Sequence, residues 1–221
     1  IFQKIFPTSK VVLQPHNKGV ALNHFHGYQD IFINHKYDYG IFFDDDVVIY
    51  NENSLNILIE INSKTNDINN TKIRDGKMDI KTYVQTVDGL EQWNPLTKTE
   101  FPVSVNFLKS DIFPAFQVEI PNFEKEEYTH DAFLEMVKNH PDLQAVSVIK
   151  ERYGYMVNDT ICEVGYVLVN GAKIMSINSE STELDDIKKT MSDVGLDGVE
   201  NINYLQAIKR VIGWIDKTLA N

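Results

Sequence analysis

The sequence predicts an α+β fold in which a large, mostly antiparallel sheet curves into an open or closed barrel with flanking helices. The sheet is predicted by a β-rich run from Ala145 to Ser179, which two turn signals interrupt, Asn158-Asp159 and Asn170-Gly171. Because Asn-Gly accepts the positive φ angles of a type I′ turn, this run predicts a three-stranded antiparallel meander. The helices are predicted by apolar residues at helical spacing over residues 129–139, 183–194 and 204–219.

The N-terminal half carries weaker strand signals. Residues 1–50 hold short aromatic-rich runs broken by glycines and by an acidic triplet at 44–46, and we interpret them as short strands and turns. The apolar run 55–61 predicts a strand. The runs 71–74 and 77–87 predict two more, joined as a hairpin by Asp75-Gly76. Prolines recur between residues 91 and 123, so long regular elements are not expected there.

Cap residues set the expected limits of the helices. Thr129 is a suitable N-cap for the helix over 129–139, and Pro141 prevents its continuation. Gly195 ends the pattern over 183–194, and an apolar stripe runs from Tyr204 to Leu219. We find no internal repeat and no linker, so a single α+β domain over residues 1–221 is expected.

Composition excludes several classes of protein. Hydrophobic residues make up 43% of the 221 residues, which is enough for a packed core. The 21 Lys and Arg residues against 32 Asp and Glu give a net charge of −11, which argues against a surface that grips duplex nucleic acid. No apolar run approaches the ~20 residues that a membrane span requires. The single cysteine, Cys162, excludes an internal disulfide framework and favours a reducing, cytoplasmic location.

Charged residues interrupt the strand patterns in pairs. Side chains alternate along a strand, so Lys72 and Arg74 share one face, and Lys150 and Arg152 share another. If such pairs pointed inward, they would line a basic surface suited to the oxygens of a phosphate chain. The alternative is that these strand faces are simply solvated, as in most antiparallel sheets, and from the residues alone this alternative is favoured.

Two stretches carry a resemblance to a known family. They are residues 70–98, which read NTKIRDGKMDIKTYVQTVDGLEQWNPLTK, and the segment 146–213. Together they resemble divergent members of the CYTH, or triphosphate tunnel metalloenzyme, superfamily. In that family an antiparallel β-tunnel binds triphosphate compounds through inward Lys and Arg, and inward carboxylates coordinate magnesium or manganese. The resemblance implies phosphate contacts by Lys72, Arg74, Lys81, Lys150 and Arg152, and binding of Mg or Mn by Glu163 and Glu180.

The family's hallmark is an N-terminal strand that reads Glu-x-Glu-x-Lys, and the start of this chain departs from it. Residues Ile1 to Phe6 offer Lys4 but no glutamate pair, and the chain begins without Met, so we expect it to be part of a longer polypeptide. The resemblance implies a metal-dependent hydrolase of triphosphate or polyphosphate compounds, in which an activated water attacks the terminal phosphorus. The missing pair leaves open a catalytically inactive module that binds polyphosphate or nucleotide, and a purely structural domain.

Three other arrangements are less favoured. His24, His26 and nearby carboxylates form a conceivable metal site, but solvated or core histidines are more common. Asp46, Glu60 and Lys64 suggest a nuclease-like cluster, yet Asn62 occupies the position that the lysine should take. Cys162 lies within a predicted strand, which favours a buried, inert thiol. Catalytic residues are not assigned.

Overall fold

The structure, a computed structural model, describes the backbone of residues 48–219 and the side chains of residues 55–219. The expectations for residues 1–47, including the strand runs, the hallmark position and the histidine cluster around His24 and His26, lie outside the described residues. Within the described range, no helix is long and apolar enough to span a bilayer.

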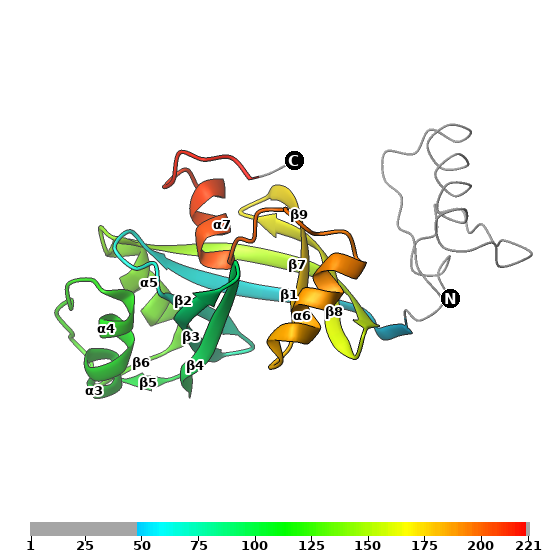
Figure 1. Ribbon diagram of the computed structural model, residues 1–221. Coiled ribbons are helices and arrows are strands. Elements are labelled where there is room, and N and C mark those ends of the chain that lie inside the picture. Colours follow the sequence, from blue (N-terminus) through cyan, green and yellow to red (C-terminus); the bar gives the residue numbers. More distant parts are fainter. Residues whose placement is uncertain (1–47, 220–221) are drawn as a thin grey trace, which may run out of the picture. The chain divides into compact units, whose positions relative to one another are not determined.

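Seven strands form one antiparallel sheet in the order β4-β3-β2-β1-β7-β8-β9 (Figure 1). This confirms the α+β class and the large antiparallel sheet. Between residues 48 and 219 the order begins at β4 and ends at β9, and no pairing of these two closes it into a barrel. The strands are β1 (Val48–Ser63), β2 (Asn69–Arg74), β3 (Lys77–Val87), β4 (Leu90–Glu100), β7 (Leu143–Val157), β8 (Thr160–Val169) and β9 (Ala172–Glu180), beside a separate pair, β5 (Val103–Ser104) and β6 (Glu127–Tyr128).

The predicted turns and meander are confirmed, because their residues adopt the required backbone. Asn170 and Gly171 have φ of 47° and 88°, as the type I′ prediction demands. Asp75 and Gly76, at 52° and 72°, likewise join β2 to β3. The expectation of irregular structure from residue 91 is wrong for β4, which accommodates Pro95 because it lies at the edge of the sheet.

The helices are α3 (Val105–Phe107), a π-helical turn η2 (Leu108–Ile112), α4 (Phe113–Phe116), α5 (His130–Asn139), α6 (Leu184–Asp193) and α7 (Tyr204–Val211). The predicted N-cap is confirmed, since the Thr129 side chain accepts a hydrogen bond from the backbone N–H of Ala132. Helix α7 ends well before the expected Leu219. Gly213, with φ of 79°, turns the chain away just after Val211.

The described chain divides into two compact units. Of the described residues, the first unit contains 48–54, 152–164 and 177–196. The second unit contains 55–151, 165–176 and 197–219. A single domain over 1–221 therefore remains a prediction, and each unit is described by itself.

In the second unit, the two faces of the sheet carry different cores. Ile59 and Ile61 of β1 belong to a cluster with Phe133 of α5, whereas Leu58 packs in a cluster with Ile208 of α7. Figure 1 shows α5 and α7 on opposite sides of β1 and β7. Because side chains alternate along a strand, the even-numbered residues of this part of β1 face α7. We call this side the α7 face.

Candidate functional site

A row of charged side chains crosses the α7 face of the second unit. Glu60 of β1 lies opposite Lys72 of β2. Lys72 in turn lies opposite Asp79 of β3, and Asp79 lies opposite Lys98 of β4. Directly opposite residues of antiparallel strands project to the same face and lie within reach of each other. We call these four residues the charged row, in which acidic and basic residues alternate from strand to strand.

Much of the charged row is withdrawn from solvent. Glu60 is only 6% exposed, and the side chains of Lys72 and Asp79 are 33% and 19% exposed. The Lys72 ammonium lies 3.5 Å from Asp79 Oδ2. A charge in such a place interacts more strongly than it would in water, because fewer solvent dipoles screen it.

Burial raises the pKa of Glu60 from 4.5 to about 8, while Lys72 and Lys150 act to lower it and Asp79 to raise it further. The Glu60 carboxyl group is therefore mostly protonated at neutral pH. Lys150 comes from β7, far from β2 in the sequence, and its ammonium also lies 4.7 Å from the centre of the Tyr204 ring of α7. Cations from two separate stretches of backbone thus act on one buried carboxyl group.

Buried polar atoms without partners lie beside this carboxyl group. Asn62, two residues after Glu60 on the same face, is 1% exposed, and neither atom of its side-chain amide has a hydrogen-bond partner in the described residues. Oδ1 of Asp79 is also buried and has no hydrogen-bond partner in the described residues. Because buried polar groups are nearly always hydrogen-bonded, such atoms mark a place where a ligand or water finds donors and acceptors.

The β3–β4 hairpin bends back toward α7. The Asn201 side chain donates to the carbonyl of Gly89, at the hairpin tip, over 2.9 Å. Asn203, the N-cap of α7, donates to both carboxylate oxygens of Glu91 over 3.1 and 3.0 Å. Two shifts in the β3–β4 register accompany this bend. Figure 1 shows the hairpin reaching the segment that precedes α7, so these hydrogen bonds hold the hairpin against that segment.

The other basic residues predicted for the second unit lie less centrally. Lys81 of β3 is half-buried, with Asn70 as its opposite residue on β2. Arg74 is exposed at the hairpin end of β2, where Nη1 donates to the Asn56 side chain over 2.9 Å. The structure therefore brings Lys72 and Lys150 together at Glu60, and it places Arg74 outside this group.

The remaining predicted site residues belong to the first unit. Nε of Arg152 donates to Oε2 of Glu163, whose side chain is 4% exposed. Glu180 is exposed and accepts a hydrogen bond from Asn178 over 3.5 Å. The two carboxylates are therefore differently placed, because a guanidinium holds Glu163 whereas Glu180 is exposed. Within residues 55–219, no three His, Cys, Asp or Glu side chains are grouped for a metal ion. The roles of these residues stay predictions.

Sequence reasoning considered Glu60 only within the nuclease hypothesis and gave no role to Asn62. Two signals could have singled them out. The first is a lone carboxyl group within the apolar run 55–61, where a charge is unfavourable without a partner. The second is the spacing Glu60-x-Asn62-x-Lys64, which matches the hallmark strand of the CYTH superfamily except that asparagine stands for the second glutamate.

Cys162 lies where the sequence predicted it. Its side chain is buried on β8, and burial raises the pKa of the thiol, although a hydrogen bond to Ser179 acts to lower it. This confirms the prediction that the thiol is buried. In the nuclease hypothesis, Asp46 lies outside the residues whose side chains are described. Lys64 donates to the carbonyl of Pro141 over 2.6 Å, so that hypothesis gains no support.

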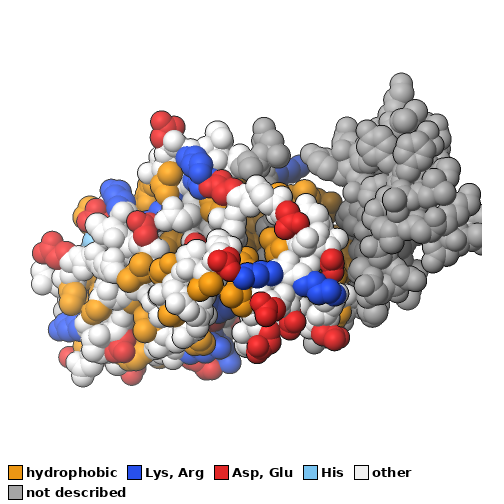
Figure 2. Space-filling model, in the orientation of Figure 1, with side chains coloured by type: hydrophobic (Ala, Val, Ile, Leu, Met, Phe, Trp, Pro, Cys, Tyr) orange, Lys and Arg blue, Asp and Glu red, His pale blue; other side chains and the backbone are white. Residues whose placement is uncertain are grey.

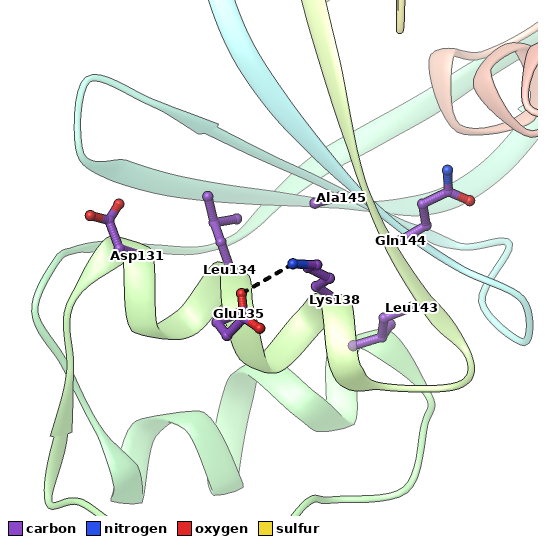
Figure 3. A pocket seen from close by; sticks show the side chains of 7 residues that line it. All are labelled: Asp131, Leu134, Glu135, Lys138, Leu143, Gln144 and Ala145. Carbon is purple, nitrogen blue, oxygen red and sulfur yellow. Dashed lines mark ion pairs between the residues drawn. The ribbon is translucent and has the colours of Figure 1, made fainter.

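A hollow beside α5 of the second unit is poorly suited to phosphate. Figure 3 shows one of about 400 Å³ between α5 and the start of β7, where Asp131 and Glu135 contribute carboxylates and Lys138 pairs with Glu135. Two carboxylates against one paired lysine would repel an anion. On the face seen in Figure 2, acidic and basic side chains are interspersed, without one large basic patch.

Comparison of the chain with protein-family models, with curated proteins and with solved structures finds no match.

Proposed function

We propose that the chain binds a triphosphate or polyphosphate compound on the α7 face, next to the charged row. The observation that carries this proposal is the position of Lys72 directly opposite the buried Glu60, and the charge of Lys150 also acts on this carboxyl group. The resemblance of residues 70–98 to the CYTH superfamily and the hallmark-like spacing at Glu60 support it. A tunnel-like closure of the curved sheet around this face belongs to the same proposal.

The residues of the site suit a phosphate chain. The ammonium groups of Lys72 and Lys150 supply positive charge, and the unpartnered amide of Asn62 supplies an N–H donor in a dry setting. Because Glu60 is mostly neutral, it does not repel an anion and can itself donate a hydrogen bond. A Mg²⁺ or Mn²⁺ ion enters this proposal with the substrate, since Mg²⁺ in particular is commonly bound through substrate phosphates.

Hydrolysis is the activity that the family resemblance adds to binding. The lysines would stabilise the charge that develops on the phosphoryl group while water attacks the terminal phosphorus. A second candidate, a binding module without turnover, is favoured by Asn62, which stands where the hallmark has its second glutamate. It is also favoured by the pairing of Glu163 with Arg152.

Binding and turnover are tested separately. Sodium tripolyphosphate is titrated into the full chain by calorimetry, with excess Mg²⁺, with excess Mn²⁺ and with EDTA, and phosphate release is followed in parallel. We expect micromolar to millimolar binding that Lys72→Met and Lys150→Met each weaken about tenfold, the effect of losing about 1.4 kcal/mol of binding free energy. The matched control is Lys77→Met on β3, because the Lys77 side chain is 65% exposed and pairs with Glu100.

The outcomes separate the candidate functions. Metal-dependent release of phosphate selects the hydrolase, and binding without release selects the inactive module. Equal loss of affinity in the Lys72, Lys150 and Lys77 variants would place binding on the surface in general and overturn the site. If tripolyphosphate does not bind under any of these conditions, both candidates are overturned and a purely structural domain remains.

A further inference from the structure

The Lys72 side chain lies between two acidic groups of unequal character. On β3, Asp79 is 3.5 Å from its ammonium group, and on β1, Glu60 occupies the directly opposite position. Glu60 is the more buried of the two carboxyl groups. Whether Glu60 carries a charge therefore decides how much of the positive charge of Lys72 and Lys150 remains for an incoming anion.

The charged groups that act on Glu60 come from three other strands of the second unit. Lys72, Asp79 and Lys150 act on it from β2, β3 and β7. Lys98 of β4 stands beyond Asp79 in the charged row. On α7, the buried ammonium of Lys209 is turned to a different acceptor pair, the carbonyl of Asn66 and the carboxylate of Asp67, at 2.8 and 2.7 Å.

With Glu60 neutral, Lys72, Lys150 and Asp79 together carry one net positive charge. With Glu60 ionised, the same set is neutral. We propose that binding of a phosphate anion on the α7 face is coupled to the uptake of one proton by the Glu60 carboxyl group. This inference rests on the proposed function and adds to it a regulation by pH. The proton comes from solvent and is released again when the anion leaves, so no other reactant is needed.

The direction of this pH dependence follows from thermodynamic linkage between the binding of the proton and the binding of the anion. An anion favours the neutral form of Glu60, and by reciprocity the neutral form favours the anion. Burial raises the pKa of Glu60 to about 8, so at pH 6.5 this carboxyl group is already protonated before the anion binds. Binding of the anion at pH 6.5 therefore takes up few protons. At pH 9 the free site is mostly ionised, so uptake approaches one proton for each anion bound.

The test is calorimetric titration of sodium tripolyphosphate into the full chain in EDTA, at pH 6.5, 8 and 9, in two buffers of different ionisation enthalpy. The difference in apparent binding enthalpy between the buffers gives the number of protons taken up. Tripolyphosphate also takes up protons, so the informative quantity is wild type minus Glu60→Gln, which has no titrating group at this position. Glu100→Gln is the matched control, because Glu100 lies on β4 with its side chain 69% exposed.

We expect the difference between wild type and Glu60→Gln to rise from near zero at pH 6.5 toward one proton at pH 9. Over the same range, the affinity of wild type should fall about tenfold more than that of Glu60→Gln. Glu100→Gln should behave as wild type. If Glu60→Gln does not fold, the Glu60 carboxyl resonance in the wild type should titrate at a higher pH with tripolyphosphate than without it.

Two failures are distinguishable. Tripolyphosphate binding with the same proton uptake in wild type and Glu60→Gln, or a Glu60 resonance that the anion leaves unchanged, overturns the coupling and leaves the proposed function standing. Absence of binding by the wild type at every pH overturns both.

Discussion

Replacing Glu60 with glutamine should change how stability depends on pH. In the folded protein burial raises the pKa of Glu60 from 4.5 to about 8. Between these two values the folded state holds a proton that the unfolded state has released. The stability that this proton contributes is fully present below pH 4.5 and is lost progressively as pH rises toward 8. At about 1.4 kcal/mol for each pH unit, the loss amounts to at most about 5 kcal/mol.

Glutamine is uncharged at every pH, so the variant should not show this loss. We expect the free energy of unfolding of Glu60→Gln, relative to wild type, to rise by several kcal/mol between pH 4.5 and pH 8. The assay is urea denaturation, monitored by the fluorescence of Trp93 and Trp214, at half-unit steps of pH. Glu100→Gln is the control, and its curve should run parallel to that of wild type. Parallel curves for wild type and Glu60→Gln would refute the reasoning, because they would mean that Glu60 is ionised in the folded protein.

Three further predictions concern stability. Lys209→Met should lower the free energy of unfolding by about 2–4 kcal/mol, because the 3% exposed ammonium group that it removes serves a buried carbonyl and a carboxylate. The control is Lys217→Met, which should lower it by under about 1 kcal/mol because the Lys217 side chain is 57% exposed. Chemical denaturation measures both free energies. Gly76→Ala should destabilise by about 1 kcal/mol, since φ is 72° there, and Gly76→Asn by less, as thermal unfolding would show. Hydrogen bonds from Arg210 and Lys217 lower the pKa of Glu200 from 4.5 to about 2. The stability that the ionised Glu200 contributes is therefore present above pH 4.5 and is lost as pH falls toward 2. An NMR titration of the Glu200 carboxyl group with a midpoint near 4.5 would contradict this prediction.

Features that depend on neighbouring residues were predictable from the sequence. The turns at Asp75-Gly76 and Asn170-Gly171 require positive φ, which their own side chains permit, and the N-cap at Thr129 bonds a backbone group one turn away. The error at β4 has the opposite origin. A proline disfavours a strand only where its missing N–H is needed, and whether Pro95 lies at an edge or in the centre is decided by which strands pair.

The candidate site was predictable only in part. Strand alternation placed Lys72 with Arg74, and Lys150 with Arg152, on shared strand faces, but it could not separate Lys72, which lies opposite Glu60, from Arg74, which lies at the exposed hairpin end. The carboxyl group between the two lysines was missed because its surroundings come from other strands. A glutamate in an apolar run is read as a surface residue until its strand is known to be central.

By itself the sequence determined the α+β class, the order of most elements and the residue types available for binding an anion. Each of these follows from chemistry within a few residues along the chain. Only the tertiary structure decided that Glu60 is buried, that Lys72 and Lys150 share it, and that Arg152 is paired with Glu163. Those relations depend on strand order and register, and hence on contacts between residues distant in sequence, which a local sequence pattern does not specify.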